Sequence, residues 1–164
     1  MTWKRVKAVA GVLLIAVASI STTQEAGGGG AGRLLRGQTL YVPVYSHVFA
    51  GDRESPFYLA ATLSVRNTDL RNPIDLLEVN YYDSAGKLLD RFLDSPVPLK
   101  PLASWQYVIA ESDKRGGPGA SFVVKWKAQR PVSPPVVETV MLSTRSQQGV
   151  SFTSRGQVVE EVEE

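Results

Sequence analysis

The chain has 164 residues, with 18 Lys and Arg against 16 Asp and Glu, one histidine and no cysteine. The absence of cysteine excludes disulfides, cysteine-based catalysis, zinc–thiolate sites and iron–sulfur clusters. A chain of this length can bury enough surface to fold without cross-links. Its basic residues are scattered rather than gathered on one face, which argues against nucleic acid as a partner.

Residues 1–21 are expected to be a signal peptide. Lys4, Arg5 and Lys7 precede the uncharged run 8–20, and a basic start, a short apolar run and small residues at the cleavage site are typical of export signals. The run is shorter than the roughly 20 residues that span a bilayer. The expected location is therefore periplasmic or secreted, with no stable membrane span after cleavage. An N-terminal membrane anchor is the less favoured alternative.

Removal of this segment changes the charge of the chain. Three of the 18 basic residues lie in it, which leaves 15 basic against 16 acidic residues. The isoelectric point of about 8.9 calculated for the whole chain therefore does not indicate a basic binding surface.

The rest of the chain divides into three parts by composition. Residues 22–36 contain four consecutive glycines and are expected to be a flexible linker. Residues 37–157 are expected to form one domain, since their number is common for a single domain. Residues 158–164 carry four glutamates and are expected to be an acidic disordered tail.

The domain is predicted to be all-β, because apolar residues alternate with polar ones at a period of two. Short strands at regular spacing with turn signals between them are typical of a sandwich or a small barrel. We favour an immunoglobulin-like antiparallel β-sandwich of about 7–8 strands, with Trp126 as the main core residue. The expected strands are 40–49, 58–66, 77–81, 88–93, 105–110, 121–128, 136–142 and 150–153.

His47 is the one histidine and therefore the first candidate for chemistry. It could act as a general base or a metal ligand, or it could be an ordinary strand residue. Without cysteine or a second histidine, a transition-metal site would need carboxylates alone, and no nucleophile motif accompanies His47. The sequence therefore predicts no catalytic residue, no metal ligand and no cofactor.

Two other segments are weak candidates for ligand binding. Residues 111–120 join two strands, contain three glycines and include Glu111 and Asp113; loops at the ends of a sandwich often bind ligands. Ser151, Thr153 and Arg155 share one face of a strand and could bind a carboxylate or a sugar. The alternatives are a long hairpin loop and a solvent-facing strand surface.

Four strings resemble a bacterial exported family, the domain-of-unknown-function family 3124. They are GQTLYVPVYSH (37–47), LSVRNTD (63–69), YYDSAGKL (81–88) and GVSFTSRG (149–156). The resemblance extends over about residues 37–159. It implies an exported bacterial protein and brings no activity, ligand or catalytic residue.

The function that these observations favour is a non-enzymatic binding or interaction module of the bacterial cell envelope. Its expected partner is a protein or another cell-envelope ligand. The alternative is a hydrolase or metal-dependent enzyme centred on His47.

Overall fold

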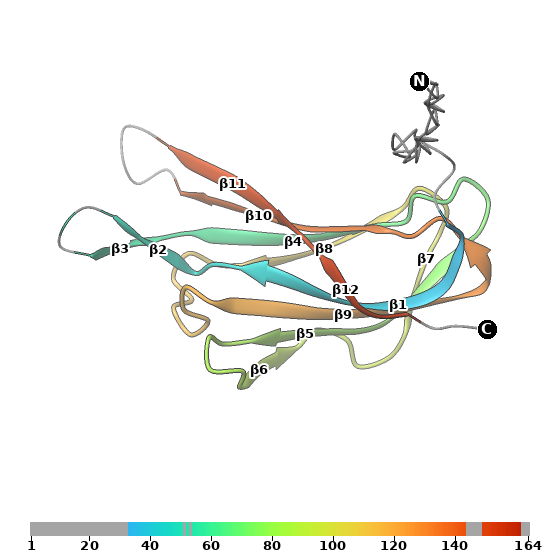
Figure 1. Cartoon of the computed structure of the whole chain (residues 1–164), viewed down its shortest axis with the longest axis horizontal. Coiled ribbons are helices and arrows are strands. Elements are labelled where there is room, and N and C mark those ends of the chain that lie inside the picture. Colours follow the sequence, from blue (N-terminus) through green and yellow to red (C-terminus); the bar gives the residue numbers. More distant parts are fainter. Residues whose placement is uncertain (1–32, 51, 53, 144–148, 162–164) are drawn as a thin grey trace, which may run out of the picture. The chain divides into compact units, whose positions relative to one another are not determined.

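The computed structural model describes residues 33–50, 52, 54–143 and 149–161. The regular secondary structure of these residues consists of β-strands alone, and the strands pair antiparallel, as the sequence predicts (Figure 1). The predicted signal peptide and most of the predicted linker lie outside the described residues. The strands are β1 (Leu35–Val44), β2 (His47–Ala50), β3 (Ser55–Tyr58), β4 (Ala60–Arg66), β5 (Ile74–Tyr82), β6 (Leu88–Arg91), β7 (Val97–Leu99), β8 (Ser104–Ile109), β9 (Ala120–Val132), β10 (Val136–Ser143), β11 (Val150–Arg155) and β12 (Gln157–Glu161).

The strands form two main sheets and a short ribbon. The six-stranded sheet has the order β12-β1-β9-β5-β6, with β7 also paired to β5, and the four-stranded sheet has the order β11-β10-β4-β8. β2 and β3 pair only with each other and make a two-stranded ribbon. The ribbon joins the two sheets, because β1 leads into β2 and β3 leads into β4.

One hydrophobic core lies between the two sheets. Leu63 of β4 and Met141 of β10 come from the four-stranded sheet, and Val42 of β1 and Phe122 of β9 come from the six-stranded sheet; all four are fully buried. Trp126 of β9 is also fully buried, which confirms its predicted place in the core. The alternation read from the sequence thus identifies the inward faces of β4 and β9.

The prediction for β5 is wrong in its first half. Alternation places Leu77 on the inward face with Val79 and Tyr81, but Leu76 is the buried residue. In the pairing with β9, Leu76 lies opposite Trp126 and Glu78 opposite Lys125. Leu77 is therefore an extra residue in a β-bulge, and a bulge shifts the face on which the following residues lie.

The ends of the domain also differ from the prediction. β1 begins at Leu35, inside the stretch expected to be linker, and β12 extends to Glu161, inside the stretch expected to be a tail. β12 pairs with β1, and Thr39 donates a hydrogen bond of 3.1 Å to the carboxylate of Glu160. Arg33 forms an ion pair of 2.8 Å with Glu161.

The described residues contain twelve strands, more than the eight expected. The expected strand 40–49 is divided at Tyr45 and Ser46, where the chain leaves the six-stranded sheet and enters the ribbon. The ladder of β1 with β9 stops at Val44, and β2 pairs with β3 instead. The alternation of apolar residues runs through both strands, so it does not reveal that the pairing partner changes.

Gly156 marks the point where the chain changes sheets near its C-terminal end. β11 belongs to the four-stranded sheet and β12 to the six-stranded sheet. The Gly156 backbone N–H donates a 2.8 Å hydrogen bond to the Val137 carbonyl. A Cβ atom at Gly156 would lie 3.2 Å from side-chain carbons of Leu40 and Val42, so a larger residue at this crossing would require these neighbours to shift by a few tenths of an ångström.

Candidate functional site

The β2–β3 ribbon carries His47 at one end of the domain. Figure 1 shows the ribbon at the same end as the β10–β11 hairpin. His47 lies opposite Tyr58 in the ladder, and Val48 lies opposite Phe57. Val48 and Phe57 pack against the core, so the alternate side chains, which include His47, Phe49 and Tyr58, lie on the outer face. We call these three residues the ribbon face.

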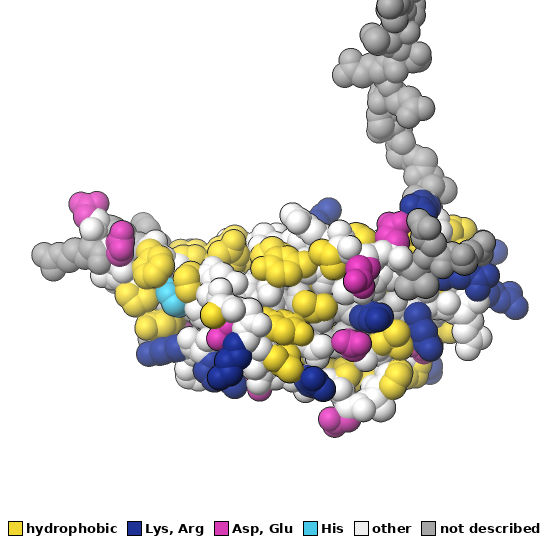
Figure 2. All heavy atoms as spheres, turned by 60° about the horizontal axis from the view of Figure 1, so that its bottom comes forward, with side chains coloured by type: hydrophobic (Ala, Val, Ile, Leu, Met, Phe, Trp, Pro, Cys, Tyr) yellow, Lys and Arg dark blue, Asp and Glu magenta, His cyan; other side chains and the backbone are white. Residues whose placement is uncertain are grey.

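The rings of the ribbon face contact each other edge to face. The His47 ring centroid lies 5.2 Å from that of Phe49 and 5.7 Å from that of Tyr58, with interplanar angles of 86° and 61°. Phe49 is 57% exposed, and His47 and Tyr58 are half-buried; Figure 2 shows the one histidine beside hydrophobic side chains. The ribbon face is therefore an accessible aromatic surface.

The loop between β8 and β9, residues 110–119, lies against the base of the ribbon. The backbone N–H and the hydroxyl of Ser46 both donate hydrogen bonds of 3.1 Å to the Gly117 carbonyl. Lys114 places its Nζ atom 4.3 Å from the centroid of the Tyr58 ring, a cation–π contact. The loop thus brings a positive charge to the ribbon face.

His47 has a polar neighbour next to it in the chain. The Oγ atom of Ser46 lies 3.4 Å from Nδ1 of His47, and the same hydroxyl donates to Gly117. In the part of the chain that the structure describes, no group of three or more His, Cys, Asp or Glu side chains could hold a metal ion.

Asp113 is held by an arginine of its own loop. Arg115 forms ion pairs of 2.7 Å with Asp113 and 2.6 Å with Asp90 of β6. The hydrogen bond from Arg115 lowers the pKa of the Asp113 carboxyl below its ordinary value. Asp113 therefore fixes the shape of the loop, and its charge is shared with a cation that also anchors the loop to Asp90.

The hydroxyl of Tyr81 lies beneath the same loop. Tyr81 is fully buried, and its hydroxyl has no hydrogen-bond partner among the described residues. Burial raises its pKa to about 12. A Cβ atom at Gly116 would overlap this hydroxyl, so the backbone of the loop closes directly on the tyrosine.

Glu111 lies where this loop meets the β10–β11 hairpin. The hydroxyl of Ser143, the last residue of β10, donates a 3.4 Å hydrogen bond to Oε1 of Glu111. The predicted site residues His47, Glu111 and Asp113 therefore come from elements that meet at one end of the domain, although the structure pairs none of the three directly.

Ser151, Thr153 and Arg155 lie on the outer face of the four-stranded sheet. All three are exposed on β11, opposite Leu142, Val140 and Glu138 of β10. Phe152 points the other way and packs against the ring of Tyr45 at 5.7 Å.

Tyr45 lies at the base of the ribbon, where β1 passes into β2. Because neighbouring side chains on a strand point to opposite faces, Ser151 and Thr153 face away from this base. They do not join the surface that includes His47.

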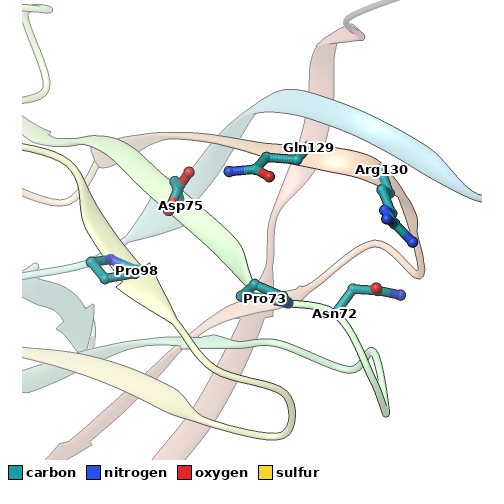
Figure 3. Close-up of a pocket in the computed structure, with 6 residues that line it drawn as sticks. All are labelled: Asn72, Pro73, Asp75, Pro98, Gln129 and Arg130. Atoms are coloured by element: carbon teal, nitrogen blue, oxygen red, sulfur yellow. The ribbon is translucent and has the colours of Figure 1, made fainter.

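A cleft of about 310 Å³ lies at the opposite end of the domain. Figure 3 shows that its lining comes from the start of β5, from β7 and from the end of β9. The sequence analysis does not identify this cleft, because its residues are far apart in the chain and none of them belongs to a recognisable motif. The lining residues are Asn72, Pro73, Asp75, Pro98, Gln129 and Arg130.

No helix in the described ranges is long and apolar enough to cross a membrane.

Comparison with known proteins gives a family and one distant structure. Residues 37–159 match the model of a family described as "Protein of unknown function (DUF3124)". No curated protein matches the chain. The crystal structure of Thermotoga maritima 1070 is similar at a TM-score of 0.45 and 11% sequence identity, over 76% of this chain and 97% of that one.

Proposed function

We propose a function from the geometry of the chain itself, because it belongs to DUF3124, a family of proteins of unknown function. The protein is a non-enzymatic binding module of the bacterial cell envelope, and its ribbon face docks on a protein partner. The single observation that carries this proposal is the aromatic cluster of exposed Phe49 with half-buried His47 and Tyr58, on a ribbon whose base is fixed by the 110–119 loop.

Aromatic residues on a rigid support are typical of the residues that dominate binding energy at protein interfaces. Val48 and Phe57 hold the back of the ribbon against the core, and Ser46 holds its base through two hydrogen bonds to Gly117. The ribbon face is therefore ordered before a partner arrives, which lowers the entropic cost of binding.

The ring geometry favours a protein over a glycan. A sugar stacks on the flat face of an aromatic ring, so a long glycan needs rings in a common plane. Here the ring of His47 is inclined by 86° to Phe49 and by 61° to Tyr58. Such a surface presents edges and hollows, which suit apolar and aromatic side chains of another protein.

Export is part of the same proposal and rests on the sequence. Lys4, Arg5 and Lys7 followed by the uncharged run 8–20 support cleavage by a signal peptidase. The test is the mass of the protein recovered from periplasm and medium after expression in a bacterium. A product that has lost about 18–26 residues supports export, and a full-length product in the cytoplasm or membrane contradicts cleavage.

The finer fold assignment, an immunoglobulin-like sandwich, is proposed with the function. Two antiparallel sheets that share one core support it. In such sandwiches, the loops and hairpins at the ends carry most binding sites, and the ribbon lies at such an end.

The experiment is site-specific photo-crosslinking in cells of the source organism. A benzophenone side chain replaces Phe49 in one variant and Val108, which is 68% exposed on β8, in the control. We expect a discrete adduct with one other protein at Phe49 and none at Val108. An adduct with the mass of two copies of this chain would contradict a distinct partner.

Affinity measurements then show whether the Phe49 side chain contributes to the binding free energy. The protein identified in the adduct is produced and titrated with wild type, Phe49→Ser and Val108→Ser. We expect at least about a tenfold loss of affinity for Phe49→Ser and no change for Val108→Ser. Equal affinity of all three proteins would overturn the proposal.

A further inference from the structure

We propose that the cleft at the other end of the domain binds a small zwitterion of about the size of a dipeptide. The inference is independent of the ribbon face, because no residue that lines the cleft belongs to β2, β3 or the 110–119 loop. It rests on a carboxylate and a guanidinium group that line one pre-formed hollow and have no hydrogen-bond or ion-pair partner among the residues that the structure describes.

The two walls of the cleft are held together by one buried amide. The Nδ2 group of Asn67 donates to the carbonyls of Asn72 at 2.9 Å, Leu99 at 3.2 Å and Lys100 at 3.1 Å. Asn72 continues into Pro73 on one wall, and Leu99 follows Pro98 on the other. The proline rings fix their own backbone angles, so the hollow exists before any ligand binds.

Asp69 fixes the same wall from the other side. Its Oδ1 atom accepts hydrogen bonds from the backbone N–H groups of Arg71 at 2.9 Å and Asn72 at 2.8 Å, and its Oδ2 atom accepts one from Ser133 at 3.2 Å. Asp69 is thus satisfied by the fold and is not itself available to a ligand. Its role is to position Asn72 and Pro73.

Asp75 is the carboxylate in the cleft that could accept hydrogen bonds from a ligand. Its side chain is half-buried, and it makes no hydrogen bond or ion pair with any described residue. Lys127 lies opposite it in the ladder of β5 with β9, but the two side chains are not within ion-pair distance. A carboxylate that has lost part of its water gains from a cationic partner.

The other end of the cleft supplies the opposite charge. Arg130 is exposed, and its side chain forms no ion pair or hydrogen bond with the described residues. Figure 3 shows the side chains of Asp75 and Gln129 pointing toward one another and the guanidinium of Arg130 directed toward Asn72. A guanidinium fork matches a carboxylate, and the Gln129 amide can both donate and accept.

This arrangement selects the ligand by charge and size. An ammonium group fits the end with Asp75, and a carboxylate fits the end with Arg130. A volume of about 310 Å³ is at the lower limit of small-molecule sites. It accommodates a compact ligand rather than a polymer, and the rings of Pro73 and Pro98 offer apolar contacts to its middle.

The experiment is an NMR titration of the purified protein with alanyl-alanine. We expect saturable shifts of the backbone amides at residues 72, 75, 129 and 130. N-acetyl-alanyl-alanine, which lacks the ammonium group, and alanyl-alanine amide, which lacks the carboxylate, should each bind about tenfold more weakly or less. Equal binding of all three probes, no saturation, or shifts elsewhere would overturn the proposal.

Variants assign each charge to its residue. Asp75→Asn should remove the preference for alanyl-alanine over the acetylated probe, and Arg130→Gln should remove the preference over the amidated probe. Asp94→Asn, which changes an exposed carboxylate elsewhere, is the matched control and should retain both preferences. Loss of both preferences in the control would show that net charge, not the cleft, decides binding.

Discussion

The backbone of Gly116 lies on the hydroxyl of Tyr81, so closely that a Cβ atom at Gly116 would overlap the Oη atom. The contact joins the 110–119 loop to the core, since Tyr81 packs on Phe122 with ring centroids 5.1 Å apart. The loop in turn holds the ribbon through Ser46 and Gly117. A small residue in a loop thereby sets the position of the aromatic surface that we propose for binding.

Gly116→Ala should lower the free energy of unfolding by about 1–3 kcal/mol, as overpacking usually does. The added methyl group would meet Tyr81 and also the Cβ atom of Ala120 at 2.9 Å. Urea unfolding measures the effect. Tyr81→Phe removes the obstructing hydroxyl without removing a described hydrogen bond, so the double variant should lose less than Gly116→Ala alone. If the two changes are simply additive, the contact is not the cause.

Trp126→Ala should lower the free energy of unfolding by about 3–5 kcal/mol, because it leaves a cavity in the core. Trp126 is fully buried, and its indole N–H has no hydrogen-bond partner among the described residues. Trp126→Phe should therefore lose less, since it keeps most of the apolar volume and removes an unpaired donor. Thermal unfolding of both variants checks this order, and an equal loss would contradict it.

Stability should fall in acid partly because of Asp69. Its pKa is lowered, first by the hydrogen bond from the Arg71 backbone and then by that from Asn72. The folded pKa lies below the unfolded value of about 3.9, so the ionised side chain stabilises the fold fully above that value. The contribution is lost as the pH falls through the folded pKa.

Asp69→Asn tests this pH dependence. Urea unfolding at pH 7 and at pH near 3 should show a smaller acid loss for Asp69→Asn than for wild type. Asp94→Asn changes an exposed carboxylate and should keep the wild-type loss. An unchanged acid loss in Asp69→Asn would show that other groups carry it.

Arg115→Gln should change stability by less than about 1 kcal/mol, because the Arg115 side chain is about half exposed and water screens both of the ion pairs that the change removes. Its larger effect should be on Asp113. The hydrogen bond from Arg115 is the main cause of the lowered pKa of this carboxyl, so the pKa should rise toward its ordinary value. An NMR titration of the carboxyl carbon measures it, and an unchanged pKa would contradict the described geometry.

Local periodicity predicted the all-β fold and the inward faces of several strands, but it could not predict changes of partner. Leu63 and Val65 alternate correctly because one partner arrangement holds along β4. The bulge at Leu77 depends on β9, which lies more than 40 residues further along the chain. The glutamates at 160–164 predict a disordered tail, but residues 157–161 form β12 because they pair with the edge of β1.

The same limit applies to the candidate sites. In the sequence, His47 and residues 111–120 are separate candidates, and the pairing of β1 with β9, which places Val44 opposite Ala120, brings them together. The cleft combines residues of three strands and a loop. Neither Asp75 nor Arg130 belongs to a motif, so only the folded chain distinguishes them from ordinary surface charges.

The crossing at Gly156 has a consequence for when the chain can fold during its synthesis. Of the twelve described strands, β1 is synthesised first and β12 last, yet the two are neighbours in the six-stranded sheet. β11, which is made just before β12, is an edge strand of the four-stranded sheet. Pairing between distant segments is slow, because a long loop must close before any contact forms. We therefore expect the chain to stay open, and able to pass through a narrow channel, until its last strands have emerged.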